Sequence, residues 1–510
     1  MTALPTLTRA LVRTRPNAGS AGGADFPDAR LLDLPERAVQ FGTGAFLRGF
    51  VDYFIDAANR AGRFNGRVVA VGSTGSGRDA VLSEQEGLYT LAVQGMAGGE
   101  VRQERRVISA LSRAISAKDD WAAVLELARR PELALVFSNT TEVGIVLDEG
   151  DAPDANPPRS FPGKLARFLY ERANALAFAE EAGVVVIPCE LIEGNGDRLR
   201  EIVLSLGARW NLGADFDAWV RAHVPFCNTL VDRIVPGAPA ADAAGRMQEE
   251  LGYRDGMLTS CEVYRLFAIE GDAVLRARLG FADSDPGIVV TESVAPYRER
   301  KVRLLNGAHT ITVSMALLAG CETVREAMEH EVVGAFIRRV TLDELVPSVD
   351  APGAEQFARD VLDRFANPFI RHALVDITLQ AAMKMRVRVV PSIVQYAAKT
   401  GHAPPLVALG FAAYLLYARG DRQDARRAAG LPVPADEQGE ALRALWSGVD
   451  ARSDAALLEL ARRATADTAL WGTDLSAVPG FAQAVGEDLG RLVRDGALAT
   501  LETQLGVERL

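Results

Sequence analysis

The most constraining feature of this sequence is a strand pattern that runs through a glycine turn into a helix and then into a second strand. Residues 37–42 (RAVQFG) and 67–73 (RVVAVGS) are continuous apolar runs, which are typical of parallel strands buried on both faces. Between them, large apolar residues follow one helical stripe: Phe46, Phe50, Val51, Phe54 and Ile55. A strand, a helix and a strand in this order predict a βαβ unit.

Further apolar runs extend this pattern through the first half of the chain. Residues 132–140, 183–191 and 287–292 are rich in Val, Ile, Leu and Phe, and helical stretches separate them. We therefore predict an α/β fold whose Rossmann-type domain, with a doubly wound sheet, covers residues 34–295. The residues before it, 1–33, are predicted to be a loose leader.

Beyond residue 300 the apolar residues recur at helical spacing. Residues 406–420 and 454–466 form long helical patterns, and Phe357, Val361 and Phe365 follow the same period. Because strand patterns are sparse here, we predict a mainly α-helical C-terminal domain over residues 296–510.

Composition limits the classes of partner and site. The net charge of −11, with no basic block, argues against nucleic acid or an anionic membrane as a partner. No apolar run reaches the length of a membrane-spanning helix, and the N-terminus lacks the apolar core of a signal peptide. The four cysteines form no CxxC pair, which favours a cytoplasmic protein with reduced thiols over a zinc or disulfide framework. The oligomeric state stays open.

The glycine turn after the first strand has the form of a dinucleotide-binding turn. Gly42 and Gly44 provide the GxG spacing, but Leu47 stands where a third glycine is usual. Arg48 could add positive charge near phosphates. An ordinary strand-to-helix turn is the alternative. The candidate cofactor residues here are Phe41, Gly42, Thr43, Gly44, Ala45, Phe46 and Arg48.

The end of the second strand does not decide between the two nicotinamide cofactors. An acidic residue at this place binds the adenosine ribose of NAD, whereas this chain continues with Ser73 and, later, Arg78 and Asp79. Ser73 is a cofactor-binding candidate, and Ser73 with Arg78 could accept the 2′-phosphate of NADP. We predict NAD, with NADP not excluded.

The stretch KVRLLNGAHT places three hydrogen-bonding side chains in an otherwise apolar run. In an α-helix Asn306 would lie roughly 140° and His309 roughly 80° from Lys301 around the axis. All three therefore fit on one side of a helix, and Leu304 and Leu305 can pack elsewhere. This pattern predicts a polar cluster with a common direction.

Six segments in order resemble the family of mannitol dehydrogenase, the polyol-specific long-chain dehydrogenases, over roughly residues 35 to 500. They are AVQFGTGAFLRGFVDYFID, VFSNTTEVGI, IPCELIEGNGDRLREIV, TLVDRIVPG, RKVRLLNGAHT and NPFIRH, and their wording is nearest to a branch that acts on hexuronates. The resemblance implies a Rossmann-type domain, a helical C-terminal domain that carries substrate-binding and catalytic residues, and a metal-independent hydride transfer. It also implies reversible NAD-dependent reduction of tagaturonate to altronate in hexuronate (galacturonate) breakdown.

In that family a Lys-x4-Asn-x2-His pattern carries the chemistry, and Lys301, Asn306 and His309 match its spacing. The resemblance implies that Lys301 stabilises the developing alkoxide and donates the proton. Asn306 would donate to the same oxygen and His309 would bind a neighbouring hydroxyl. The chain has only five histidines and no convincing zinc-ligand set.

Two residues of the first domain are further catalytic candidates. Asn195, in EGNGD after a predicted strand, is a candidate second oxyanion donor, although Asn-Gly also favours turns. Asp232 is a candidate for orienting Lys301 or for binding a substrate hydroxyl, and a structural ion pair with Arg233 is the alternative.

The remaining candidates concern the cofactor ribose and the substrate carboxylate. The segment Asn139, Thr140, Thr141 and Glu142 follows a strand at the edge where the nicotinamide ribose should lie, or it forms a helix cap. Among the basic residues of NPFIRH and AAMKMRVR, the substrate-binding candidates are Arg371, His372 and Lys384, with Arg371 and Lys384 as the preferred carboxylate pair.

Other functions remain open from the sequence. A relative acting on fructuronate and mannonate, or on a neutral polyol such as mannitol, would share the same motifs. A non-catalytic dinucleotide-binding sensor is a different class of function, and the complete Lys301, Asn306 and His309 set argues against it.

Overall fold

The computed structural model describes residues 4–15, 23–73, 77–140 and 144–506. The chain divides into two compact units. The first comprises Met1–Gln94 and Arg102–Val294, and the second comprises Gly95–Val101 and Ala295–Leu510. Residues 95–101 lie inside the range predicted for the N-terminal domain, yet they group with the second unit.

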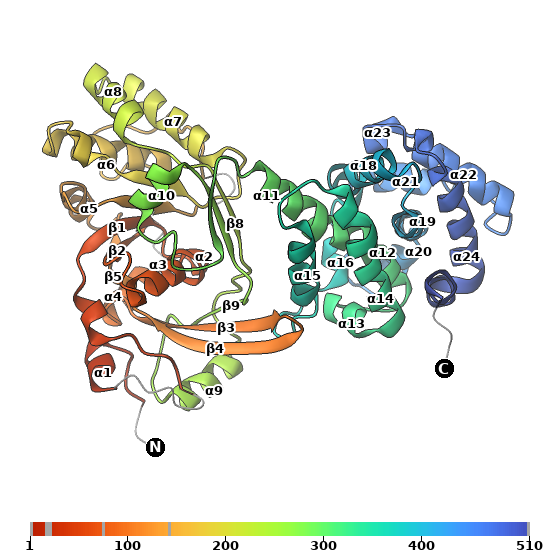
Figure 1. Cartoon of the computed structure of the whole chain (residues 1–510), viewed down its shortest axis with the longest axis horizontal. Coiled ribbons are helices and arrows are strands. Elements are labelled where there is room, and N and C mark those ends of the chain that lie inside the picture. Colours follow the sequence, from red (N-terminus) through yellow and green to blue (C-terminus); the bar gives the residue numbers. More distant parts are fainter. Residues whose placement is uncertain (1–3, 16–22, 74–76, 141–143, 507–510) are drawn as a thin grey trace. The chain divides into compact units, whose positions relative to one another are not determined.

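A five-stranded parallel sheet forms the centre of the first unit, with the strand order β5-β2-β1-β6-β7 (Figure 1). This order places β1 in the middle and confirms the predicted Rossmann-type α/β fold. The strands are β1 (Glu36–Phe41), β2 (Arg67–Gly72), β5 (Leu111–Ser116), β6 (Leu135–Ser138) and β7 (Val185–Pro188).

Both faces of this sheet are buried, which explains the continuous apolar runs. Alternate residues of a strand point to opposite faces: Ala38 joins one hydrophobic core, whereas Val39 and Phe41 join the other. Helices α3 (Val51–Arg60), α4 (Arg78–Glu84) and α10 (Ala273–Leu279) contribute to the first core. The second core contains residues of α5 (Trp121–Ala128), α6 (Phe161–Ala175), α7 (Asn195–Arg209) and α8 (Ala214–His223).

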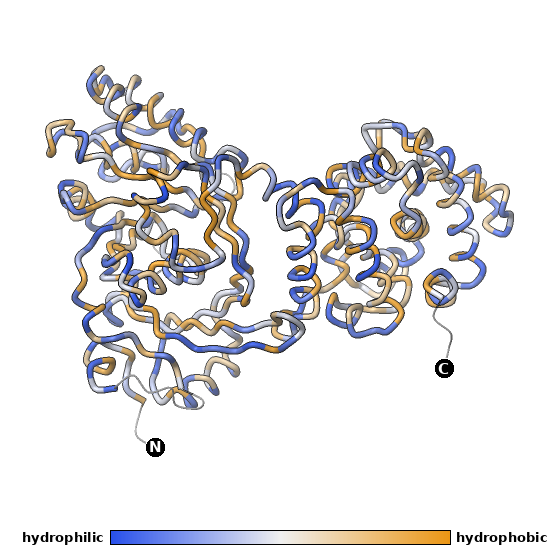
Figure 2. The backbone as a smooth tube through the Cα atoms, viewed as in Figure 1, coloured by the Kyte–Doolittle hydropathy of each residue, from blue (hydrophilic) through white to orange (hydrophobic). Residues whose placement is uncertain are grey.

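Two three-stranded sheets accompany the central sheet, and the sequence patterns missed most of their strands. One has the order β11-β10-β8 and contains β11 (Ile288–Thr291), which was predicted, although not in a separate sheet. The other has the order β4-β3-β9. Its strand β4 is largely hydrophilic in Figure 2, and most of its first six residues are exposed. The additional strands are β3 (Tyr89–Ala97), β4 (Glu100–Ile108), β8 (Thr229–Asp232), β9 (Thr259–Cys261) and β10 (Leu266–Glu270).

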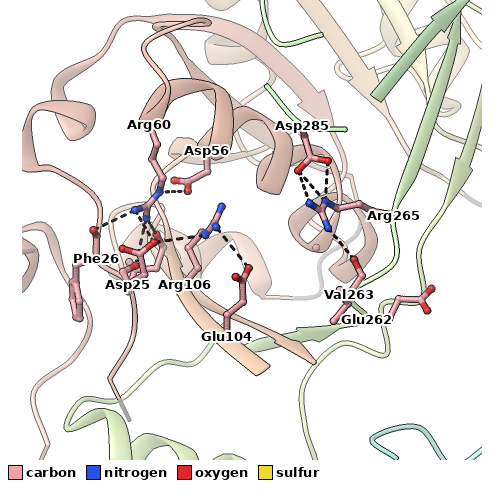
Figure 3. A network of polar contacts seen from close by, with 12 residues as sticks. Asp25, Phe26, Asp56, Arg60, Glu104, Arg106, Glu262, Val263, Arg265 and Asp285 are labelled. Carbon is pink, nitrogen blue, oxygen red and sulfur yellow. Dashed lines mark hydrogen bonds and ion pairs between the residues drawn. The ribbon is translucent and has the colours of Figure 1, made fainter. Parts of the chain in front are cut away.

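The prediction of a loose leader is wrong for the described part of residues 1–33. Helix α1 (Arg9–Thr14) and the 3-10 turn η1 (Ala29–Asp33) form there, and apolar residues of this segment pack into a small core with Tyr253. Asp25 bonds through its backbone to Arg105 and Val107, and its carboxylate pairs with Arg60 (Figure 3). The buried leader residues are Leu7, Val12, Ala24, Phe26 and Leu32.

The second unit is built from helices, as predicted. Its described helices of eight or more residues are α12 (Gly307–Leu318), α14 (Glu331–Arg339), α15 (Ala354–Phe365), α18 (Val390–Thr400), α19 (Pro405–Ala418), α20 (Asp421–Ala428), α22 (Asp454–Ala466) and α24 (Phe481–Leu505). The central helix α19 packs on α12 at Gly410, where an added Cβ would lie 2.8 Å from the Ile311 carbonyl oxygen. Gly420, with φ +106°, ends this helical stretch as its sequence pattern indicated.

Within the described residues, no helix combines the length and apolarity needed to cross a bilayer. The four cysteines are buried free thiols. Shorter elements of the second unit matter for the site described next: α11 (Ala295–Arg300), α13 (Val324–Glu329), α16 (Leu374–Ile377) and α17 (Ala381–Lys384).

Candidate active site

The glycine turn that follows β1 requires glycine at its first position. Gly42 has φ +138°, a backbone conformation that side chains strain, and its N–H donates to the Val71 carbonyl oxygen at 2.9 Å. An added Cβ would lie 3.0 Å from Leu47 Cδ1 and 3.3 Å from the Asn139 carbonyl oxygen. Leu47, at the position of the usual third glycine, therefore fills the space behind this turn.

Gly44 differs from Gly42 because it borders open space. It precedes α2 (Ala45–Gly49) with φ −67° and ψ 161°, and an added Cβ would meet nothing within 4 Å. Backbone from Thr43 to Phe46 can thus be approached closely by a ligand at the start of the helix. A Rossmann-type cofactor needs this arrangement for its pyrophosphate, so the turn fits a dinucleotide.

Arg48 supports the glycine turn from inside the unit, and the prediction that it adds positive charge near the phosphates stays a prediction. Its side chain is buried and donates to the Thr43 carbonyl oxygen and, at 3.1 Å, to Thr259 Oγ1. Tyr89 Oη in turn donates to the Arg48 carbonyl oxygen at 2.8 Å. Burial lowers the pKa of Arg48. The guanidinium is therefore held by protein acceptors, which a sequence pattern does not reveal.

An acidic residue lies beside the end of β2 even though the strand itself ends in Gly72 and Ser73. Asp79, in the first turn of α4, places its Oδ2 3.7 Å from the position of a Cβ built on Gly72. Ser73 and Arg78 are exposed. The carboxylate thus reaches the end of the second strand from the following helix, where an acid that binds ribose is expected.

Glu190 connects the carboxyl ends of β6 and β7. Its buried carboxylate accepts hydrogen bonds from Ser138 Oγ at 3.1 Å, from the Thr140 N–H at 3.0 Å and from Thr140 Oγ1 at 3.1 Å. Burial raises the pKa of Glu190, and these donors oppose that effect. The neighbouring Asn139 donates through Nδ2 to the Cys189 carbonyl oxygen at 2.7 Å. Asn139 and Thr140 are therefore held at the predicted edge of the sheet, whereas Thr141 and Glu142 lie outside the described residues.

The prediction that Asn195 donates to the substrate oxygen conflicts with its surroundings. Asn195 is fully buried, and its Nδ2 donates to the Pro188 and Glu190 carbonyl oxygens at 3.1 and 3.0 Å and to Thr229 Oγ1 at 3.0 Å. Its Oδ1 accepts from the Gly196 and Thr229 N–H groups, both at 2.9 Å. The amide joins the end of β7 to the start of β8 and has no donor left for a ligand.

Asp232 is buried at the carboxyl end of β8. The adjacent Arg233 does not depend on it for hydrogen bonds: it donates to the Glu262 and Gly49 carbonyl oxygens at 2.9 and 2.8 Å. Its guanidinium also lies 4.5 Å from the ring centre of Tyr53. Arg233 is thus a structural residue of the first unit, and the assignment of Asp232 stays a prediction.

In the second unit, the stretch that carries Lys301 begins as a π-helix rather than the predicted α-helix. The π-helical segment η3 covers Lys301–Asn306, and the Gly307 N–H bonds to the Val302 carbonyl oxygen five residues earlier. Residues five apart are neighbours along such a helix, as residues four apart are along an α-helix. Asn306 therefore lies over Lys301, and His309, three residues further in α12, continues the same row. The wider turn brings the three side chains closer to one face than α-helical geometry would.

A buried arginine that the sequence analysis did not select holds this π-helical segment. Arg303 Nε donates to Ser392 Oγ at 2.7 Å, and its two terminal nitrogens bond Glu299 and Gln395 on one side and Ser348 on the other. Burial lowers the pKa of Arg303. The only sequence signal for it is a lone arginine inside an apolar stretch, and that signal does not distinguish anchoring from function.

His309 lies among aromatic and positively charged side chains. Its ring stacks on Phe365 with ring centres 3.8 Å apart, and His372 meets it edge-on at 5.1 Å. Burial lowers the pKa of His309 well below its usual value, and the charges of His372, Arg364, Arg388 and Lys384 act in the same direction. His309 is therefore neutral at neutral pH, with one ring nitrogen as donor and the other as acceptor.

The three substrate-binding candidates do not share one environment. His372 contacts His309, and Lys384 is partly buried with its Nζ donating to the Ile377 carbonyl oxygen at 3.0 Å. Arg371 is exposed, and its charge lowers the pKa of Glu326, whose carboxylate caps α13. His372, although exposed, and Lys384 thus lie near His309, whereas Arg371 is exposed beside Glu326.

Among the residues that the structure describes, no group of three or more His, Cys, Asp or Glu side chains could hold a metal ion. The polar groups near His309 are instead hydrogen-bond donors and cations. Such groups stabilise a developing negative charge on oxygen, and the partly buried neutral histidine beside them can bind a hydroxyl.

Comparisons with known proteins agree with this architecture. The mannitol dehydrogenase Rossmann domain matches residues 36–282, and the mannitol dehydrogenase C-terminal domain matches residues 293–493. The altronate oxidoreductase of Bacillus subtilis (strain 168) is 41% identical over 468 residues, covering 92% of this chain and 95% of that protein. The altronate oxidoreductase of Yersinia enterocolitica is 39% identical over 483 residues, covering 94% and 98%.

Solved structures show the same two-part fold. A ternary complex of Pseudomonas fluorescens mannitol 2-dehydrogenase with NAD and D-mannitol has a TM-score of 0.60 and 26% identity, covering 94% of this chain and 96% of that one. A substrate-free D-sorbitol dehydrogenase has a TM-score of 0.74 at 22% identity, covering 97% and 100%. On the evidence of both domain matches and these relatives, the chain belongs to the mannitol dehydrogenase family.

Proposed function

We propose that this chain is an NAD-dependent oxidoreductase that interconverts D-tagaturonate and D-altronate. The observation that carries the proposal is near-full-length similarity to altronate oxidoreductases, at 41% and 39% identity. The complete set of Lys301, Asn306 and His309 on one helical row supports turnover rather than cofactor binding alone.

The first unit would hold the cofactor through its backbone. The turn from Gly42 to Gly44 and the N–H groups at the start of α2 would bind the pyrophosphate, because Gly44 leaves this backbone open. Asn139 and Thr140, held by Cys189 and Glu190, would position the ribose near the reacting ring. When bound, the nicotinamide ring supplies or accepts the hydride.

The second unit would supply the proton and stabilise the oxygen. Lys301 donates a proton to the carbonyl oxygen during reduction and takes it back during oxidation. The Asn306 amide donates to the same oxygen as negative charge develops there. His309 binds a neighbouring hydroxyl of the substrate, and its neutral ring can both donate and accept. His372 supports the His309 ring from its edge.

The assay that tests the proposal compares substrates by the loss of NADH absorbance at 340 nm. Purified protein should oxidise NADH with tagaturonate faster than with fructuronate or fructose, and EDTA should leave the rate unchanged because the proposed reaction uses no metal. A preference for fructuronate or fructose would assign a different substrate within the family. No oxidation with any of the three would favour a cofactor-binding sensor.

Asp79 gives the reason for proposing NAD rather than NADP. A carboxylate at the end of β2 would bind the ribose hydroxyls of NAD and repel the 2′-phosphate of NADP. Asp79→Ala should raise the ratio of kcat/KM for NADPH to that for NADH by about 10- to 100-fold. Glu84→Ala, at the exposed far end of α4, is the matched control and should leave the ratio unchanged. If Asp79→Ala leaves the NADPH to NADH ratio of kcat/KM unaltered, Asp79 does not select NAD over NADP.

The predicted cytoplasmic location also belongs to this proposal. Four buried free thiols support a reducing compartment.

A further inference from the structure

Two partly buried cations lie next to the row of Lys301, Asn306 and His309. Lys384 ends α17, and Arg388 lies in the π-helical segment η6 (Met385–Val389) that follows it. The segment η6 packs directly on α12: a Cβ added to Gly307 would lie 3.1 Å from the Arg388 carbonyl oxygen. Arg388 also donates to Thr310 Oγ1 at 3.4 Å, one residue beyond His309. The backbone thus brings both cations to the catalytic row.

Neither cation has a carboxylate partner within the described residues. Lys384 bonds to the Ile377 carbonyl oxygen and Arg388 to the Thr310 hydroxyl, both neutral acceptors. The nearby Asp436 uses its two carboxylate oxygens to accept the Ala382 and Gln438 N–H groups at 3.0 and 3.1 Å. Burial lowers the pKa of both cations, and the Arg388 charge lowers the pKa of Lys384 further, although the Asp436 carboxylate acts in the opposite direction on Lys384. Two adjacent, partly desolvated positive charges are costly unless an anion binds between them.

Other basic residues of the same region are engaged differently. Arg371 is exposed, and its charge lowers the pKa of Glu326. Arg386 is exposed and lies against Gly472, where an added Cβ would meet its Nε at 2.9 Å. The charges with the largest effect on the pKa of His309 are instead those of His372, Arg364, Arg388 and Lys384.

We propose that Lys384 and Arg388 together form the receptor for the carboxylate of the substrate, and that Arg388 determines the preference for sugar acids over neutral polyols. This inference rests on the proposed function and replaces Arg371 with Arg388 in the predicted carboxylate pair. The planar guanidinium of Arg388 can bind both carboxylate oxygens, and Lys384 adds a point charge beside it. A sugar alcohol of the same length offers a hydroxymethyl group there and leaves both cations without an anion.

The test compares altronate with altritol, which carries a CH2OH group in place of the carboxylate. Binding of each to the NADH-loaded enzyme is measured by calorimetry, together with kcat/KM for oxidation with NAD. In Arg388→Gln the affinity for altronate should fall on the order of 100-fold, as expected when one partner of a desolvated charge pair is removed. The affinity for altritol should change less than about threefold, since no charge pair is lost there.

Four further variants separate recognition of the carboxylate from effects on folding. Arg388→Lys keeps the charge and should recover part of the altronate affinity, and Lys384→Gln should also weaken altronate selectively. Arg371→Gln and Arg386→Gln, which remove exposed charges, should leave both ligands unaffected. Thermal unfolding of each variant identifies any loss that comes from misfolding.

Equal losses for altronate and altritol in Arg388→Gln would overturn the inference and assign Arg388 a structural role between η6 and α12. A larger loss in Arg371→Gln would restore the original pair. Failure of the proposed function is distinguishable because the wild-type enzyme would then turn over neither altronate nor tagaturonate. In that case wild-type binding of gluconate and galactonate, lost in Arg388→Gln, would still support a sugar-acid receptor, and its absence would overturn it.

Discussion

Replacing Lys301 with alanine should lower kcat for tagaturonate reduction by about three to five orders of magnitude, because one group both stabilises the alkoxide and supplies its proton. The Asn306 amide and the hydrogen bonds to the substrate remain, so a small residual rate is expected. NADH binding should be unchanged, since the turn from Gly42 to Gly44 belongs to the first unit. Single-turnover measurements at saturating NADH separate the chemical step from binding.

The matched control for this prediction is Lys399→Ala in the same unit. Lys399 is exposed and pairs with Asp350 at 2.6 Å on the surface, and its loss should leave kcat unaltered. The Lys301→Ala protein should also unfold at a temperature close to that of the wild type. A kcat within tenfold of the wild type would contradict the assignment of Lys301 as proton donor.

Gly44→Val should weaken NADH binding by about 100-fold or more while leaving the unfolding temperature nearly unchanged. The backbone conformation at Gly44, with φ −67° and ψ 161°, is allowed for any residue, and no heavy atom lies within 4 Å of a Cβ built there. A valine side chain therefore fits the fold without strain. It would occupy the space through which a pyrophosphate must approach the helix start. The measurements are NADH fluorescence titration and thermal unfolding.

Gly42→Ala should instead lower the unfolding temperature, and Gly245→Val is the control for NADH binding. At Gly42 a side chain meets Leu47 and the Asn139 carbonyl at a backbone conformation that only glycine adopts readily, so the unfolding temperature should fall by a few degrees. Gly245, in α9 (Ala241–Leu251), is a glycine around which a Cβ meets nothing within 4 Å, and its change should not affect NADH. Normal NADH affinity in Gly44→Val would exclude the turn as the pyrophosphate site.

Four of the five strands of the central sheet were predictable from continuous apolar runs, whereas β5, which has partly exposed residues between its buried ones, was missed. Strands β1 and β2 are covered on both faces, so their apolar runs are continuous and cannot be confused with surface strands. Strand β4 was not predictable for the converse reason: most of its first six residues are exposed and largely charged or polar. The structure of residues 1–33 was not predicted for a similar reason. The few apolar residues of this segment are widely spaced, and they form a hydrophobic core only by packing with distant residues such as Tyr253.

Two predictions within the site share one difficulty. Arg48 and Asn195 have the residue types that bind phosphates and oxyanions, but both are buried and donate hydrogen bonds within the first unit. Their partners, such as Thr259 and Thr229, are 211 and 34 residues away in the sequence. No local pattern reports such partners, and therefore a sequence alone cannot separate a structural donor from a functional one.

Most strands of the central sheet, the glycine turn and the spacing of Lys301, Asn306 and His309 followed from the sequence, because each depends on local periodicity or on a motif read along the chain. The tertiary structure decided how these residues are presented. Hydrogen bonds from Arg303 to Ser392 and Ser348 hold the π-helical segment in which Asn306 follows Lys301 by five residues. Packing of η6 against Gly307 brings Arg388, rather than Arg371, to His309. Both outcomes depend on contacts between distant segments, whose energies do not appear in local sequence.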